Sequence, residues 1–166
     1  WAGRRTLAGE PVVDGVVTNP LAHTVATALR IDHSTHGGDI AVIEPELFHA
    51  HDIEADDTSS VRIITKRGTH IGLGLTLCAA KQTPPRVIVT GTRGRIVFSY
   101  TEDILTITSG NKERIERCGR TSLLENLIDH VRDSRVELRS PISASGGFMR
   151  VLEAVREPGL EVLAIE

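Results

Sequence analysis

The stretch that decides the fold is Ile71-Gly72-Leu73-Gly74-Leu75-Thr76-Leu77-Cys78. Large apolar side chains alternate in it with small ones, and a period of two puts the two kinds on opposite faces of a β-strand. One face of this strand is a hydrophobic wall, and the other is flat and carries only Gly, Thr and Cys. Such a strand belongs to a sheet with one face buried in the core.

Further strand patterns lie on both sides of this stretch. Residues 61–65 alternate in hydrophobicity and lead into Arg67-Gly68, a sequence typical of a hairpin turn. The segment Pro84-Pro85 separates this hairpin from a second set of strands, in which Gly91–Gly94 forms a turn. We expect strands at 12–17, 40–48, 87–90, 95–100, 104–108, 112–117 and 160–165.

Three helices are expected, one before the strands and two after them. The first begins with Asn19 as its N-cap and Pro20 at its first helical position, and Leu21, Val25 and Leu29 line its apolar stripe. The other two are centred on 123–131 and 148–155. Because helices and strands are segregated, the order predicts an α+β domain over 1–166, with an open, mostly antiparallel sheet and helices packed on one face.

The flat second face of the sheet must either contact water or pack against another protein surface. Its Gly, Thr, Ser and Cys side chains suit close approach by a second subunit, which predicts a homo-dimer or tetramer. A solvated face is the alternative, because antiparallel sheets often have one face in water.

Composition excludes several classes of function. The formal charge is −3, and the sequence has no basic block, so we expect no nucleic-acid partner. No apolar run approaches the roughly 20 residues that cross a bilayer.

Cys78 and Cys118 stand outside any C-x-x-C pair and no signal peptide precedes them, which predicts a cytoplasmic location. The first residues, Trp1-Ala-Gly-Arg-Arg, include no initiator Met, and we expect this chain to be part of a longer polypeptide.

No glycine-rich phosphate cradle is present. Gly72-Leu-Gly74 lies inside a strand and lacks the third glycine, and Gly91-Thr-Arg-Gly94 joins two strands without opening a helix. A G-x-S-x-G nucleophile elbow is also missing. If this protein uses a nicotinamide cofactor, a different part of the protein must hold it.

Histidine and acidic clusters favour surface loops over metal sites. His33-x-x-His36 lies in a polar loop without further ligands at metal spacing, and we interpret it and His49-x-His51 as surface histidines. The segment 52–57 resembles a calcium loop but has no glycine at its sixth position. We expect a solvated acidic turn there; the alternative places a carboxylate at the rim of a substrate pocket, and makes His51 and Asp57 candidate substrate-binding residues.

His23 is the most informative histidine. It lies in the first turn of the expected helix and projects away from the apolar stripe, so it is not simply part of the core. The partial positive charge at a helix N-terminus disfavours an imidazolium there. A neutral, accessible imidazole is suited to act as a general base. A surface or structural histidine is the alternative.

The sequence resembles the C-terminal domain of the Gfo/Idh/MocA oxidoreductases over nearly its whole length. Gly15-Val-Val-Thr-Asn19-Pro-Leu-Ala-His23 is similar to the family's helix start, which has the pattern Asp-x-x-x-His. Asp57-Thr-Ser-Ser-Val-Arg-Ile resembles the first strand of its hairpin, and 87–97 resembles its strand, turn and strand. Residues 123–155 are similar to its paired closing helices. The resemblance implies a fold like that of the C-terminal domain of dihydrodipicolinate reductase.

The resemblance also implies a function. Family members bind NAD or NADP in an N-terminal Rossmann domain, which this chain lacks, and exchange hydride with a sugar, inositol or related polyol. His23 matches the family's catalytic histidine, whereas the catalytic lysine belongs to the Rossmann half. Asn19 occupies the place of the usual Asp, where it can bind a substrate hydroxyl but cannot electrostatically stabilise a protonated His23. We therefore expect an inactive fragment of an oxidoreductase that binds no cofactor or metal itself; the alternative is a non-catalytic binding or assembly domain.

Overall fold

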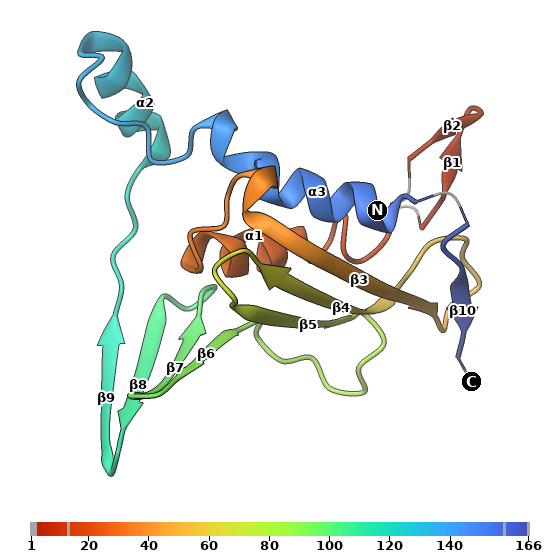
Figure 1. Cartoon of the computed structure of the whole chain (residues 1–166), viewed down its shortest axis with the longest axis horizontal. Helices are drawn as coiled ribbons and strands as arrows, with labels where there is room; N and C mark the ends of the chain where they lie inside the picture. The colour runs from red at the N-terminus through yellow and green to blue at the C-terminus, as the bar shows by residue number, and fades with distance from the viewer. Residues whose placement is uncertain (1–2, 13, 158, 166) are drawn as a thin grey trace. The chain divides into compact units, whose positions relative to one another are not determined.

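The computed structural model describes residues 3–12, 14–157 and 159–165, and its chain forms two compact units (Figure 1). The first comprises Trp1–Lys81 and Ser143–Glu166, and the second comprises Gln82–Ile142. The predicted strands are divided between two four-stranded sheets, one in each unit. In the sequence, Pro84-Pro85 lies in the segment that follows the strands of the first sheet and precedes those of the second, and its two prolines lack the N–H groups that strand pairing needs.

The sheet of the first unit has the order β10-β3-β4-β5. The strands β3 (Ile40–His49), β4 (Thr58–Thr65) and β5 (His70–Thr76) pair antiparallel, and β10 (Val162–Ala164) pairs parallel to β3. β10 pairs only with Leu47, Phe48 and His49 of β3. Pro45 lies before this paired stretch, so the edge of β3 that faces β10 needs no N–H at Pro45. The α+β class and the open, mostly antiparallel sheet are confirmed.

Alternating burial in β4 and β5 matches the prediction. Val61, Ile63, Leu73 and Leu75 are all buried, whereas the small residues that alternate with the leucines, Gly72, Gly74 and Thr76, are exposed. Leu77 was expected on the buried face and is 40% exposed. The β5 strand ends at Thr76, and Leu77 makes the last contact with the neighbouring chain through its amide, which donates to the carbonyl of Asp57 at 2.9 Å.

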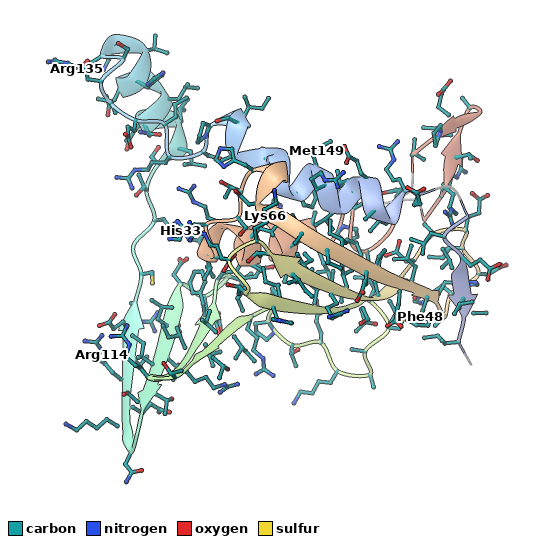
Figure 2. All side chains as sticks on the ribbon, in the orientation of Figure 1. His33, Phe48, Lys66, Arg114, Arg135 and Met149 are labelled. Atoms are coloured by element: carbon teal, nitrogen blue, oxygen red, sulfur yellow. The ribbon has the colours of Figure 1, made fainter. Side chains whose placement is uncertain are left out.

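Two helices complete the core of the first unit. α3 (Gly146–Val155) packs on β3 and on α1 (Ala22–Ile31), and Figure 1 shows α3 running along β3. Val25 and Leu29 of α1 and Val151 of α3 are at most 2% exposed. Met149, on the opposite side of α3, is exposed (Figure 2). The expected apolar stripes of both helices are therefore the faces that they bury.

A pair of glycines lets α3 approach the loop that follows α1. A Cβ atom on Gly147 would lie 2.3 Å from the carbonyl oxygen of Ser34, and one on Gly146 would lie 2.8 Å from the amide of Gly37. The amide of Gly147 donates to the carbonyl of Thr35 at 2.7 Å. Backbone packs directly on backbone here, and only glycine has room for it.

The segment before α1 differs from the prediction. Residues 14–17 are not a strand; Val16 and Val17 are fully buried within a series of turns, and Val13 lies outside the described residues. The nearest strands are β1 (Thr6–Leu7) and β2 (Glu10–Pro11), which form a hairpin of their own. The strand prediction for 12–17 was therefore wrong, because apolar composition alone does not distinguish a buried turn from a strand.

The second unit is an antiparallel meander followed by a helix. Its strands are β6 (Val87–Gly91), β7 (Gly94–Ser99), β8 (Ile104–Ser109) and β9 (Lys112–Arg117), close to the predicted bounds. The predicted turn at Gly91–Gly94 joins the first two.

α2 (Leu123–Arg132) is the helix of the second unit, and Ser122 caps it by accepting from the amide of Glu125. Its apolar stripe is 39–77% exposed, so α2 does not cover the sheet of its own unit as the sequence pattern suggested. Among the described residues, none of the helices combines the length and hydropathy needed to cross a bilayer.

Asp32 joins the end of α1 to the β4–β5 hairpin. Partial burial opposes its ionisation, but hydrogen bonds from Ser34, Thr69 and Thr65 and the charge of Arg67 outweigh this and lower its pKa below the usual 3.8. A lowered pKa in the folded state means that the carboxylate stabilises the fold above the unfolded-state pKa. This contribution is lost as the pH falls through the folded-state pKa.

We predict that Asp32→Asn lowers the free energy of unfolding by about 1 kcal/mol at neutral pH, because hydrogen bonds to a charged acceptor become weaker neutral ones. The difference from the native chain should shrink progressively below pH 3.8. Urea unfolding followed by circular dichroism over a pH series measures it. Glu46→Gln, on an exposed carboxylate of β3, is the control. A loss of stability that does not change with pH would contradict the prediction.

Candidate functional site

Asn19 lies in the turns that precede α1 and does not cap the helix. α1 begins at Ala22, and Leu21 occupies the N-cap position without a side-chain hydrogen bond. The amides of Thr18 and Asn19 both donate to the carbonyl of Gly15, so consecutive turns delay the helix. The side-chain amide of Asn19 donates to Oδ1 of Asp14 at 2.7 Å. The predicted N-cap was therefore wrong, although Asn19 does stand exposed just before the helix.

His23 is the second residue of α1 and is exposed. The next two residues, Thr24 and Val25, are buried on the opposite side of the helix. The expectation that the imidazole projects away from the core is therefore confirmed. Its ring is available to a ligand or to another part of the protein.

A shallow cleft of about 210 Å³ opens beside Asn19. Asp14 and Arg156 contribute its charged groups, and Arg156 also donates to the carbonyl of Pro11 at 2.7 Å. The remaining lining residues are Val12, Thr18 and Leu152. This cleft offers a carboxylate, an amide and a guanidinium, which together suit a ligand rich in hydroxyl groups. His23 is not part of its lining.

Asp56 holds the segment that carries Asn19. Its side chain is fully buried, and Oδ2 accepts from the amide of Val17 at 3.3 Å and from the hydroxyl of Ser59 at 2.7 Å. The Asp56 carbonyl accepts from the amide of Val16 at 2.9 Å. Oδ1 faces Gly15, where a Cβ atom would lie only 1.6 Å away, and it has no hydrogen-bond partner among the described residues.

His51 and Asp57, both predicted as rim residues of a substrate pocket, are in direct contact. Nδ1 of His51 lies 2.7 Å from Oδ2 of Asp57. The same oxygen accepts from the amides of Ala50 and His51 at 3.0 and 2.9 Å. These residues belong to the loop that follows β3, and Phe48 marks the end of that strand (Figure 2). The loop is thus folded around one buried carboxylate.

Cys78, which no sequence motif marks as a site residue, joins this pair. Its Sγ lies 3.5 Å from Nδ1 of His51. Burial opposes the ionisation of Asp57, but hydrogen bonds from the His51 amide, the Cys78 thiol, the His51 ring and the Ala50 amide outweigh it and lower the pKa of Asp57 to about 2. Asp57 is therefore an anion at neutral pH.

The fold is shared with solved oxidoreductases. The chain is similar to UDP-N-acetylglucosamine 3-dehydrogenase from Acidithiobacillus ferrooxidans (TM-score 0.68, 12% identity, 85% of this chain and 46% of that one). An oxidoreductase from Agrobacterium radiobacter was solved with NAD+, L-tartaric acid and magnesium. It matches over 95% of this chain and 53% of its own, with a TM-score of 0.66 and 16% identity. Aldose-aldose oxidoreductase from Caulobacter crescentus, complexed with glycerol, matches over 93% of this chain and 47% of its own, with a TM-score of 0.69 and 14% identity.

These similarities confirm the expected α+β fold, which the chain shares with part of each of these solved oxidoreductases. The chain spans about half the length of the solved structures that it matches. No protein-family model and no curated protein matches the sequence. At identities of 12–16%, the shared property is the fold, and the function has to be argued from the residues of the site.

The contact between Gly15 and Asp56 generates a test of how the Asn19 segment is held. We predict that Gly15→Ala destabilises the chain by about 1–3 kcal/mol, the usual cost of overpacking, because the new methyl group would overlap a buried carboxylate. Urea unfolding measures the effect. Gly38→Ala, at an exposed glycine, is the matched control, since no atom lies within 4 Å of a Cβ atom there. Equal stability of the two variants would show that Asp56 does not hold this segment.

Proposed function

We propose that this chain is the C-terminal, substrate-binding domain of a cytoplasmic NAD(P)-dependent oxidoreductase that oxidises a hydroxyl group of a sugar, inositol or related polyol. The observation that carries the proposal is an exposed imidazole at the start of α1, four residues after Asn19, which lines a polar cleft, on a fold shared with sugar oxidoreductases. The nicotinamide cofactor would be bound by another part of the protein, because the glycine loops of this chain do not form a phosphate cradle. Alone, the chain would not turn over.

In this mechanism His23 acts as the general base. Oxidation of a carbinol removes a hydride from carbon and a proton from oxygen, and the bound nicotinamide supplies the hydride acceptor. His23 would take the hydroxyl proton on its neutral ring, which leaves a carbonyl product and an imidazolium. Asn19 and the charged groups of the cleft would bind neighbouring hydroxyls and so orient the reacting carbon.

His51 and Asp57 remain predicted residues of the substrate rim. In the proposed site Asp57 acts indirectly, because its carboxylate is buried and bonded to its own loop. His51 has a side chain that is 60% exposed, which leaves one edge of the imidazole open to a ligand.

A non-catalytic binding or assembly domain is the second candidate. The observation that favours it is the hydrogen bond between Asn19 and Asp14, which uses the amide that would otherwise face the substrate. In addition, an amide at this position cannot stabilise a protonated His23 electrostatically. A binding domain would retain the cleft and need no proton acceptor, so the role of His23 separates the two candidates.

We predict that His23→Ala in the longer protein lowers the dehydrogenase rate about 10²–10⁴-fold, the usual contribution of a general base, without changing its thermal unfolding. Steady-state measurement of NAD(P)H formation over a panel of sugars and polyols tests this. His70→Ala, which removes another exposed imidazole from β5, is the control. Turnover that survives in His23→Ala would remove His23 from the mechanism, and a folded protein without turnover on any substrate would favour the binding domain.

The outward face of the β3–β5 sheet is proposed as the surface between subunits. Arg62 and Glu44 form an ion pair across it, next to exposed Gly72 and Gly74. This flat surface allows close approach of a second sheet.

We predict a dimer or tetramer by light scattering at high micromolar concentration. Gly74→Trp should shift it toward monomer, because a bulky side chain would hold the two sheets apart. Gly68→Asn, in the hairpin turn, is the control because Asn tolerates the positive φ of that residue. A monomeric native chain would contradict the proposed interface.

A further inference from the structure

Three potential metal ligands from two segments, the β3–β4 loop and the residues after β5, converge at one end of the sheet in the first unit. His51 comes from the loop after β3, Asp57 immediately precedes β4, and Cys78 follows β5. One ligand atom from each lies within 4.8 Å of the other two. Nδ1 of His51 is the central atom, 2.7 Å from Oδ2 of Asp57 and 3.5 Å from Sγ of Cys78.

The geometry does not fit a thiol–imidazole–carboxylate relay. In such a relay one ring nitrogen contacts the nucleophile and the other contacts the carboxylate, so that a proton can cross the ring. Here the same nitrogen, Nδ1, faces both the carboxylate and the thiol. The arrangement therefore directs three ligand atoms toward a common point instead of activating Cys78 as a nucleophile.

The separations between these atoms are close to those of a tetrahedral zinc site. Zinc lies about 2.0–2.2 Å from nitrogen and oxygen ligands and about 2.3 Å from sulfur. In a tetrahedral site these bond lengths put nitrogen roughly 3.3 Å from oxygen and roughly 3.6 Å from sulfur. The distance between His51 and Cys78 already fits, and the contact between His51 and Asp57 would have to open by about half an ångström. We propose that His51, Asp57 and Cys78 bind a zinc ion.

The surroundings of the three ligands hold them in place for the ion. The Asp57 carboxylate is fixed by the amides of Ala50 and His51, and the amide of Cys78 donates to the hydroxyl of Thr76 at 3.0 Å. Thr76 is in turn hydrogen-bonded to Thr58 across the strands at 2.8 Å. Such outer contacts orient first-shell ligands and are a regular part of metal sites.

The fourth coordination position would face solvent. The His51 side chain is 60% exposed and Cys78 is partly exposed, while Asp57 closes the inner side. Three protein ligands and one water molecule form the open type of zinc site. The donor set also selects the metal, because thiolate and imidazole favour zinc over the oxygen-seeking magnesium and calcium ions.

The test is metal binding by this chain itself, and it needs neither turnover nor cofactor. We expect one zinc ion per chain by isothermal titration calorimetry after treatment with chelator. Cobalt(II) as a spectroscopic substitute should show a thiolate-to-metal charge-transfer band. Magnesium and calcium at the same concentration should give no comparable heat.

Variants separate this site from adventitious binding. Cys78→Ser and His51→Gln should each weaken zinc binding by at least about tenfold, since even loss of an outer-shell partner costs that much. Cys118→Ser and His70→Gln, the matched controls on the second free cysteine and on an exposed histidine, should bind as the native chain does. Circular dichroism of each apo variant checks that it is folded.

Two outcomes would overturn the proposal. One is the absence of zinc uptake by the folded native chain, in which case the cluster only clamps its loop. The other is a result that does not depend on Cys78. This would be zinc affinity that Cys78→Ser leaves unchanged, or a cobalt(II) charge-transfer band that is lost in Cys118→Ser. Neither outcome tests the catalytic role of His23, which is measured separately as turnover of the longer protein.

Discussion

Two consecutive buried carboxylates at the entrance to β4 fix the loops of the first unit against its sheet. Asp56 accepts from Val17 and Ser59, and Asp57 accepts from the loop around His51. Burying a negative charge is costly unless hydrogen-bond donors replace the lost water. Each carboxylate is therefore compatible with few loop conformations, and the segment before α1 and the loop after β3 are held through two neighbouring residues.

This constraint brings both chemical sites to segments that carry no regular structure of their own. Asn19 precedes α1 in a run of turns, and His51 lies between two strands, yet each is held by hydrogen bonds to a buried residue. Loops positioned in this way by a rigid sheet are where proteins usually place binding groups. Proton transfer at His23 and metal binding at His51 would then share one structural support while remaining chemically independent.

Much of the fold could be predicted from the sequence because its signals are local. The alternation from Ile71 to Thr76 and the stripe through Val25 and Leu29 depend only on neighbours along the chain. Contacts between distant segments had no such signal. Cys78 reaches His51 only because β4 and β5 pair in a particular register, and Arg156 reaches the cleft beside Asn19 only because α3 packs where it does. The late start of α1 reflects turns that bury Val16 and Val17, which helix-capping preferences do not predict.

The two glycines at the start of α3 also decide the position of its far end. An α-helix rises about 1.5 Å per residue, so the ten residues from Gly146 to Val155 span about 15 Å. Because the helix is rigid and its first turn is fixed, a tilt of a few degrees at Gly147 displaces Arg156, at the other end, by about an ångström. The position of Arg156 in the cleft beside Asn19 therefore depends on a backbone contact at the opposite end of the helix, where two residues without side chains allow close approach.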